Sequence, residues 1–231
     1  MSKPAEFDEY AEDYDAALDR GIALSGEDKD YFARRRMEWL RHRLDGLTDR
    51  PKRVMDFGCG SGTATPFFFD VLGASFVLGV DTSAKSLDVA THQYGSDRTK
   101  FQLLDRYQPS GTMDVVYSNG VFHHIPPGER ATALGCIWNS LRPGGLFALW
   151  ENNPLNPGTR LVMSRIPFDR NAVPLTAFAA RRLLQAGRFD VLRTDHLFIF
   201  PRALNVLRGV EPSLSSFPIG AQYQILSRKP A

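Results

Sequence analysis

The sequence predicts one α/β domain built on a doubly wound, seven-stranded sheet that is mostly parallel. Short apolar runs of strand length alternate along the chain with helical stretches of about ten to fifteen residues. Each such stretch can carry the chain back across the sheet, which parallel neighbouring strands require. The length of 231 residues and the 43% share of hydrophobic residues suit a single domain, 1–231, with a full core.

The first 47 residues are predicted to be helical. Apolar residues recur there at steps of three and four, at Ala33, Met37, Leu40, Leu44 and Leu47, with arginines on the other face. The sequence Thr-Asp-Arg-Pro at 48–51 predicts a turn, which ends this helical pattern. Strands are then predicted over 53–57, 75–80, 99–104, 113–118 and 146–150, and helices over 63–72, 83–94 and 128–141.

Past residue 151 the alternation lapses. The segment 152–175 holds four Pro and has no clear period, so it is predicted to be an ordered but irregular insertion. A helix is predicted over 176–186, strands over 189–200 and 220–227, and a second irregular insertion over 201–218. The last two strands should form a hairpin-like pair with a long connection, the final strand being antiparallel.

Ligands of open α/β sheets bind beyond the carboxyl ends of the strands. We therefore expect 52–151 to form a ligand-binding core. The helical segment 1–47 should form a cap or lid over it, together with the insertions 152–175 and 201–218.

Composition and charge exclude several classes of protein. No apolar stretch approaches the length of a membrane span. The segment 1–19 holds seven acidic residues against one Lys, unlike a secretory signal or a transit peptide. A net charge of only +2 argues against a nucleic-acid binder. Two cysteines, Cys59 and Cys136, cannot make a disulfide framework, so we expect a cytoplasmic protein.

A glycine-rich turn follows the first predicted strand, with the sequence Asp-Phe-Gly-Cys-Gly-Ser-Gly at 56–62. Glycines there allow a sharp turn and a close approach of the backbone to a ligand. A dinucleotide-binding fingerprint starting at Gly58 needs glycine at 63, where Thr63 stands. A phosphate-binding loop is excluded because no Gly-Lys-Ser/Thr follows. The spacing thus disfavours a dehydrogenase.

This turn resembles the glycine motif of the class I S-adenosylmethionine-dependent methyltransferases, and further motifs follow in the family's order. The second strand closes on Val80-Asp81 and the third on Leu104-Asp105. The sequence at 114–125, Asp-Val-Val-Tyr-Ser-Asn-Gly-Val-Phe-His-His-Ile, is similar to the fourth-strand motif of the small-molecule branch. Leu-Arg-Pro-Gly-Gly at 141–145 is the usual lead into the fifth strand. The resemblance covers about 52–151. It implies a Rossmann-like fold, S-adenosylmethionine as methyl donor, S-adenosylhomocysteine as product, and no metal.

The resemblance also implies which residues contact the donor: Asp56, Gly58, Cys59, Gly60, Gly62, Asp81, Thr82, Asp105, Asn119, Tyr14 and Arg36. Asp81 would bond the ribose hydroxyls, a role for which a bidentate acceptor is well suited. Alternatively, Asp81 caps the helix that follows it. Asp105 would face the adenine. Alternatively, it is an acidic residue of an ordinary turn. Tyr14 would lie against the sulfonium by cation–π attraction, or it packs within a helix. Arg36 would reach the donor's carboxylate, or it is solvated.

His123 and His124 are the candidate catalytic residues. Methyl transfer is an in-line displacement, and a general base is needed only if the nucleophile must lose a proton. The alternative is that both histidines are structural. Adjacent residues at the start of a helix point apart, and the sequence joins no cluster of metal-ligating residues to them, so we predict no metal site.

The candidate acceptor-binding residues are Glu151, Asn153, Arg160 and His196. Glu151 and Asn153 follow the fifth strand and are expected to face the acceptor cavity, unless they only bond within the loop. His196 is either a ligand contact or a core histidine. Arg160 stands with Arg165 and Arg170 in the first insertion of a basic C-terminal part. These arginines anchor an anionic group of the acceptor, pair with the acidic N-terminus, or are solvated surface.

Nucleic acid is excluded as the acceptor. The tetrad of amino-methylating DNA enzymes is absent, because Ser-Asn-Gly-Val stands at 118–121. Neither cysteine follows a proline, as the cytosine-5 enzymes require, and no basic stripe with aromatics suggests RNA binding. A small-molecule acceptor, possibly anionic, is predicted, with transfer to oxygen, nitrogen or carbon left open. The alternative is a non-catalytic donor-binding sensor or scaffold subunit. The sequence predicts no oligomeric state.

Overall fold

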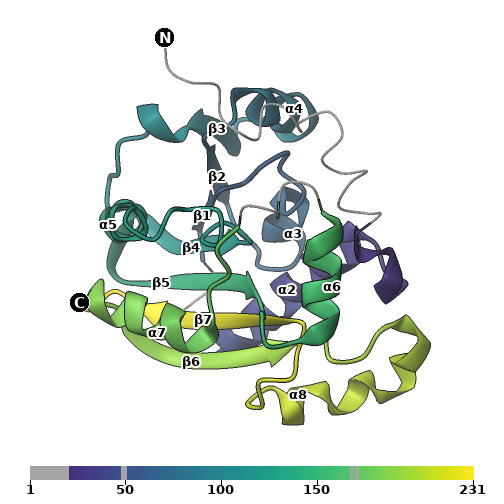
Figure 1. Ribbon diagram of the computed structural model, residues 1–231. Helices are drawn as coiled ribbons and strands as arrows, with labels where there is room; N and C mark the ends of the chain where they lie inside the picture. The colour runs from purple at the N-terminus through teal and green to yellow at the C-terminus, as the bar shows by residue number, and fades with distance from the viewer. Residues whose placement is uncertain (1–20, 48–50, 167–168, 170–171) are drawn as a thin grey trace.

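A computed structural model describes residues 21–47, 51–166, 169 and 172–231. Its centre is a seven-stranded sheet with helices on both faces (Figure 1). The strands lie in the order β3-β2-β1-β4-β5-β7-β6. Their bounds are β1 Arg53–Phe57, β2 Phe76–Asp81, β3 Thr99–Leu103, β4 Met113–Asn119, β5 Leu141–Asn152, β6 Asp190–Leu197 and β7 Gln222–Arg228.

The predicted fold class is confirmed. From β3 to β5 each neighbouring pair is parallel, whereas β7 runs antiparallel to both β5 and β6. The strand order reverses direction between β1 and β4, which is where open α/β sheets bind ligands. The carboxyl ends of β1, β4 and β5 therefore meet at one edge, beside the turns that follow them.

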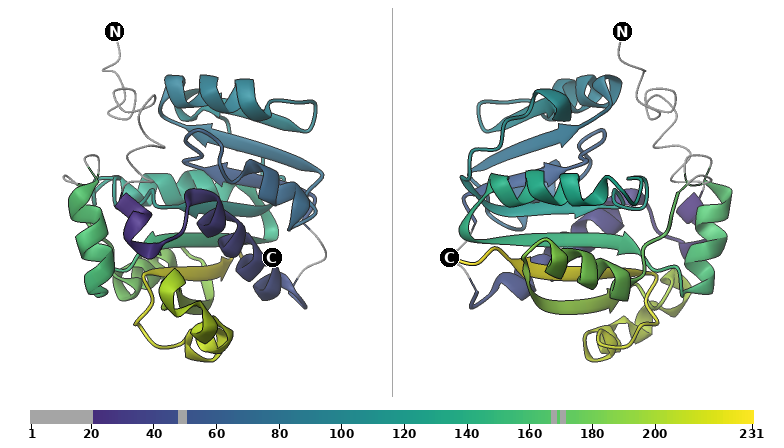
Figure 2. Two further views of the ribbon diagram at one scale, coloured as in Figure 1. Left: turned by 90° about the vertical axis from the view of Figure 1, so that its right-hand side faces the viewer. Right: turned by 60° about the vertical axis from the view of Figure 1, so that its left-hand side comes forward.

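Helices cover both faces of the sheet. On one face, α5 (Arg130–Ser140) and α7 (Ala177–Ala186) bury Leu134 and Leu184 in a core that includes Phe147. On the other face, α2 (Lys29–Leu44) and α3 (Thr65–Asp70) bury Met37 and Phe68. Figure 2 shows these two layers from the side. The helix α4 (Ala84–Tyr94) packs against β2 and β3.

The helical segment before the sheet is placed differently from the predicted cap. The buried residues of α2 lie against the sheet face, and Asp195 of β6 holds its second half by accepting from Trp39 Nε1 at 3.1 Å and Arg43 Nε at 2.8 Å. The start of α2 and the short 3₁₀-helix η2 (Ala23–Ser25) reach the carboxyl edge. Residues 1–20, including Tyr14, lie outside the described residues.

Both insertions contain helices among their described residues, contrary to the prediction. The first contains α6 (Pro157–Arg165), which begins at a capping Asn156 whose Oδ1 accepts from Thr159 N at 3.0 Å. The second contains the 3₁₀-helix η5 (Arg202–Val210) and the short helix α8 (Glu211–Leu214). Figures 1 and 2 show α6 beyond the carboxyl end of β5, as a cover of the ligand edge requires. No helix among the described residues is long and apolar enough to cross a membrane.

Candidate active site

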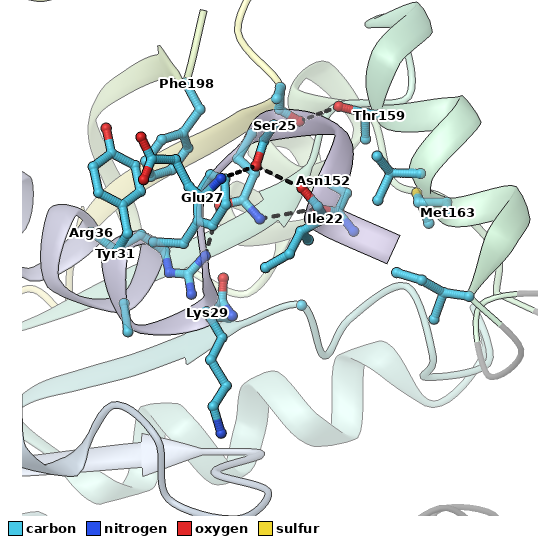
Figure 3. Close-up of a pocket in the computed structure, with 18 of the residues that line it drawn as sticks. Ile22, Ser25, Glu27, Lys29, Tyr31, Arg36, Asn152, Thr159, Met163 and Phe198 are labelled. Carbon is cyan, nitrogen blue, oxygen red and sulfur yellow. Dashed lines mark hydrogen bonds between the residues drawn. The ribbon is translucent and has the colours of Figure 1, made fainter. Parts of the chain in front are cut away.

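A cavity of about 470 Å³ lies at the carboxyl ends of β1, β4 and β5 (Figure 3). Its walls come from the glycine turn after β1, the turn after β4, the first turns of α2, and α6. The segment after β6 closes the remaining side. One part of the lining is polar and the other part is apolar. The apolar part is formed by Ile22, Phe32, Leu161, Val162, Met163, Ile166, Phe198, Ile199, Phe200 and Pro201.

The glycine turn needs glycine for two different reasons. Gly58, Gly60 and Gly62 have φ angles of +76°, +51° and +81°, a region that side chains disfavour. A Cβ at Gly58 would also stand 2.3 Å from Cγ2 of Val121. A Cβ at Gly60 would meet nothing within 4 Å, because that position faces the cavity. Gly62 is not in the lining, and a Cβ there would press on Tyr94 and Ala90 of α4.

Asp81 holds the glycine turn in place. Its Oδ2 accepts from the amide of Gly60 at 2.8 Å, and its Oδ1 accepts from Ser83 N at 2.9 Å. The cap of α4 itself is Ser83, whose Oγ accepts from Ser86 N. Asp81, the exposed Thr82 and the exposed Asp105 lie at the ends of β2 and β3 and do not line the cavity. Their predicted contacts with ribose and adenine stay predictions.

Asp56, Tyr117 and Arg36 form the polar floor. Asp56 and Tyr117 are register partners on β1 and β4, and Arg36 of α2 lies on the same face. Nη1 of Arg36 donates to Gln222 at 3.0 Å, and Nε2 of Gln222 donates to Asn152 at 3.0 Å, as Figure 3 shows. Burial and the charge of Asp81 raise the pKa of Asp56 to about 8, against the opposing effect of Arg36.

Three buried polar atoms at this floor have no hydrogen-bond partner: Nε of Arg36, the hydroxyl of Tyr117 and Oδ1 of Asn119. All three residues line the cavity. An unsatisfied buried donor or acceptor costs about 1–3 kcal/mol, so such atoms mark a place where a polar ligand can bind. A donor and an acceptor, with the Asp56 carboxyl beside them, suit a ligand that carries both a carboxylate and an ammonium group.

The two histidines after β4 form one network with two carboxylates. Nδ1 of His123 lies 2.5 Å from Oε2 of Glu151, and Nε2 of His123 lies 3.5 Å from Oδ1 of Asp169. Nε2 of His124 lies 3.4 Å from the same Asp169 oxygen. The centroids of the two imidazole rings are 4.1 Å apart. Both histidines and Asp169 line the cavity. The histidines therefore share a carboxylate, and the prediction that their side chains point apart is wrong.

The charges within this network follow from its ion pairs and hydrogen bonds, which outweigh the effect of burial. Burial alone would lower the pKa of His123, but the charge of Glu151 and a hydrogen bond to Asp169 raise it to about 10. For Asp169, burial acts to raise the pKa, and the two histidines outweigh it and lower the pKa. His123 is thus protonated between two carboxylates at neutral pH. Ligand atoms of His123, His124 and Asp169 lie within 4.8 Å of one another, close enough to share a cation. The expectation that no metal-ligating residue joins the two histidines is therefore wrong, because Asp169 stands beside both.

The predicted acceptor residues lie elsewhere. Glu151 is 1% exposed and turned to the α5 face, where its Oε1 accepts from Phe122 N at 2.7 Å. Asn153 donates to the carbonyls of Pro218 and Gly220, so it bonds within the loops. Arg160 and Arg165 are exposed on α6, and Arg170 lies outside the described residues. His196 is buried away from the cavity, and burial lowers its pKa. None of the described residues in this group lines the cavity.

The sequence did not reveal three polar contributors to the cavity. Asp169 lies in a stretch without period, and Gln222 begins a strand that no motif marks. Arg208 comes from η5 and pairs through Nη1 with Glu27 at 2.9 Å, which ties the second insertion to the start of α2. No pattern in the sequence brings these residues to one place, because their proximity depends on how the insertions fold back.

Comparison with known proteins agrees with these features. Residues 54–145 match a family model described as a methyltransferase domain. A trans-aconitate 2-methyltransferase of Deinococcus radiodurans is 35% identical over 104 residues, which cover 45% of this chain and 39% of that protein. One from Methylobacterium nodulans is 27% identical over 200 residues, 77% of this chain and 76% of that protein. The chain spans about half the length of the first curated relatives it matches.

Solved structures share the whole fold. One chain of the complex between the Haloferax volcanii Trm112 methyltransferase activator and a methyltransferase superposes with a TM-score of 0.67 at 20% identity over 100% of both chains. An S-adenosylmethionine-dependent methyltransferase of Mesorhizobium loti gives 0.60 at 19% identity, over 83% of this chain and 97% of that one. In its fold, its glycine turn and the match over 54–145, this chain is similar to the class I S-adenosylmethionine-dependent methyltransferases.

Proposed function

We propose that this protein transfers the methyl group of S-adenosylmethionine to a small-molecule acceptor. The observation that carries this proposal is the position of two of the unpartnered polar atoms, Nε of Arg36 and Oδ1 of Asn119, in the same cavity as the open backbone of Gly60. Arg36 suits the donor's carboxylate, and Asn119 with Asp56 suits its ammonium group. Asp81 and Asp105 extend the donor site along the edge toward β3.

The bound donor would supply an activated methyl carbon on a sulfonium. The residues of this chain have to hold the acceptor in line with the leaving sulfur and keep water out. The cavity volume of about 470 Å³ falls within the range of about 300–1,000 Å³ typical of small-molecule sites. The apolar wall formed by α6 and 198–201 suits the body of such an acceptor. The location we propose is the cytoplasm, since Cys59 and Cys136 are both free.

Calorimetric titration tests the donor site. We expect saturable binding of S-adenosylmethionine and S-adenosylhomocysteine, and no binding of NADH. Arg36→Ala should weaken donor binding, because it removes the partner of the donor's carboxylate. Arg34→Ala is the matched control, since Arg34 is exposed on the same helix. Saturation with NADH but not with either sulfur compound would contradict the proposal.

Methyl transfer is a separate measurement. The relatives named trans-aconitate 2-methyltransferase make trans-aconitate the first acceptor to test, followed by the low-molecular-weight fraction of a cell extract with methyl-labelled donor. Label in a small molecule supports the enzyme. Donor binding without transfer to any fraction supports the second candidate, a sensor or scaffold subunit.

A further inference from the structure

We infer that the acceptor carries a proton on the atom that receives the methyl group, as a hydroxyl or a protonated amine does, and that His124 accepts this proton with Asp169 as its positioning residue. The inference rests on the proposed methyl transfer and names the class of substrate. It implies that this chain does not methylate an ionised carboxylate, which is the reaction that the name of its relatives suggests.

Position is the first argument. His124 and Asp169 lie in the lining of the cavity that also contains the glycine turn, and the His124 side chain is 17% exposed there. Oδ1 of Asp169 stands 3.4 Å from Nε2 of His124, and the Asp169 side chain is only 4% exposed. A buried carboxylate at this distance fixes the orientation of an imidazole and stabilises its protonated form.

The second argument is how firmly the network is held. Glu151 fastens the turn after β4 through the Phe122 amide and Nδ1 of His123. Val173 N donates to the His123 carbonyl at 2.8 Å, and Arg130 donates to the Val173 carbonyl at 2.8 Å. The segment that carries Asp169 is thus attached to the turn that carries the histidines. A ring that only filled space would not require two buried carboxylates at this wall.

The charge of the network is the third argument. Glu151, protonated His123 and Asp169 together leave one negative charge beside His124. That charge disfavours a carboxylate acceptor at the same place. The arginines of the lining have other partners: Arg36 donates to Gln222, and Arg208 pairs with Glu27. Lys29, at the start of α2, is a further basic residue of the lining.

The chemistry of the acceptor completes the argument. A carboxylic acid is already ionised at neutral pH and attacks a methyl group without a base. A hydroxyl or an ammonium group must lose its proton. As the new O–CH₃ or N–CH₃ bond forms, the S–CH₃ bond breaks and the sulfur leaves with its electron pair as a neutral thioether. The O–H or N–H electrons stay on the nucleophile, and the proton passes to the imidazole of His124, whose cation then faces Asp169.

Alkali distinguishes the two classes of product. Wild-type protein is incubated with methyl-labelled S-adenosylmethionine and, in parallel, with trans-aconitate or with the low-molecular-weight fraction of a cell extract. The products are then treated with mild alkali. Methyl esters release labelled methanol, whereas methyl ethers and methylamines keep their label. We expect the label to be stable to alkali. Labelled methanol would overturn the inference while leaving the proposed methyl transfer intact. No labelled product at all would overturn both.

Variants test the two residues with the labelled acceptor fraction. His124→Gln should lower the turnover rate by about 10²–10⁴-fold, the usual contribution of a general base, with the affinity for S-adenosylhomocysteine unchanged. Added imidazole should restore part of the rate. Asp169→Asn should lower the turnover rate less, also without loss of affinity. His92→Gln and Asp190→Asn are matched controls at exposed positions and should keep full activity.

Two outcomes would overturn the residue assignment. One is full turnover in His124→Gln. The other is a parallel loss of S-adenosylhomocysteine affinity and turnover in both network variants without rescue by imidazole, since this is what a purely structural network would give.

Discussion

The amide of Gly60 donates to Oδ2 of Asp81 at 2.8 Å, so the acid that ends β2 holds the turn that follows β1. The two strands are parallel neighbours, and Phe57 is the register partner of Val80. This register places the turn and the acid at the same edge. The carbonyl of Val80 adds two further bonds, to the amides of Gly58 and Cys59. The protein's own hydrogen bonds therefore fix the shape of the glycine turn.

Asp81→Ala should act on both stability and binding. Losing the two amide contacts should cost about 1–3 kcal/mol of stability, and losing a charged acceptor for the ribose should cost about 1.5–3 kcal/mol of donor affinity. Thermal unfolding and calorimetry measure the two effects separately. Asp88→Ala on the exposed face of α4 is the control. Unchanged donor affinity in folded Asp81→Ala protein would show that Asp81 serves the turn alone.

Donor binding should release a proton from Asp56. The pKa of this carboxyl is about 8 because of burial and the charge of Asp81, so at pH 7 the group is mostly protonated. The sulfonium and ammonium charges of the donor favour its ionised form, and up to about one proton should leave per donor bound. Calorimetry at pH 7 in two buffers of different ionisation enthalpy counts that proton. Asp56→Asn should remove the buffer dependence, and Asp88→Asn should keep it.

The centre of the sheet could be predicted because β1, β2, β4 and the second half of β5 each contain a short, largely apolar run. The helix α6 was missed because four Pro in 152–175 suggested irregular structure. The sequence does hold a helix-start signal there, since Asn156 caps the helix and Pro157 occupies its first turn. For a Pro-rich stretch, the position of each Pro relative to a capping residue is more informative than the number of Pro residues.

The candidate site could be predicted only where it follows strand ends. Asp56, Asn119 and the glycine turn lie at the cavity because β1 and β4 are parallel neighbours whose carboxyl ends coincide. Glu151 is also at a strand end, but the alternation of side chains along β5 turns it to the opposite face. Asp169 could not be predicted, because its place depends on how the chain between α6 and α7 returns to the turn after β4.

Stability should fall at alkaline pH through the buried pair of His123 and Glu151. The pKa of His123 is about 10 in the folded protein and near its ordinary value of about 6.5 when unfolded. Its contribution is therefore fully present below about pH 6.5 and is lost as the pH rises through about 10. Between pH 7 and 10 the melting temperature of wild-type protein should drop further than that of His123→Gln, by at least about 2–4 °C. Equal slopes for the two proteins would contradict a protonated His123.

Alanine at two glycines of the same turn should separate folding from binding. Gly58→Ala combines a left-handed backbone with a Cβ placed 2.3 Å from Val121, and it should cost about 2–4 kcal/mol of stability. Gly60→Ala has only the backbone cost of about 1–2 kcal/mol, because a Cβ there meets no protein atom within 4 Å. That Cβ enters the cavity, so Gly60→Ala should weaken S-adenosylhomocysteine binding more than it weakens the fold.

Val121→Ala should restore part of the stability lost in Gly58→Ala and none of the affinity lost in Gly60→Ala. Chemical denaturation and calorimetry on the three single variants and the two double variants give both quantities. Equal losses of stability in Gly58→Ala and Gly60→Ala, with no rescue by Val121→Ala, would show that backbone strain alone sets the requirement for glycine.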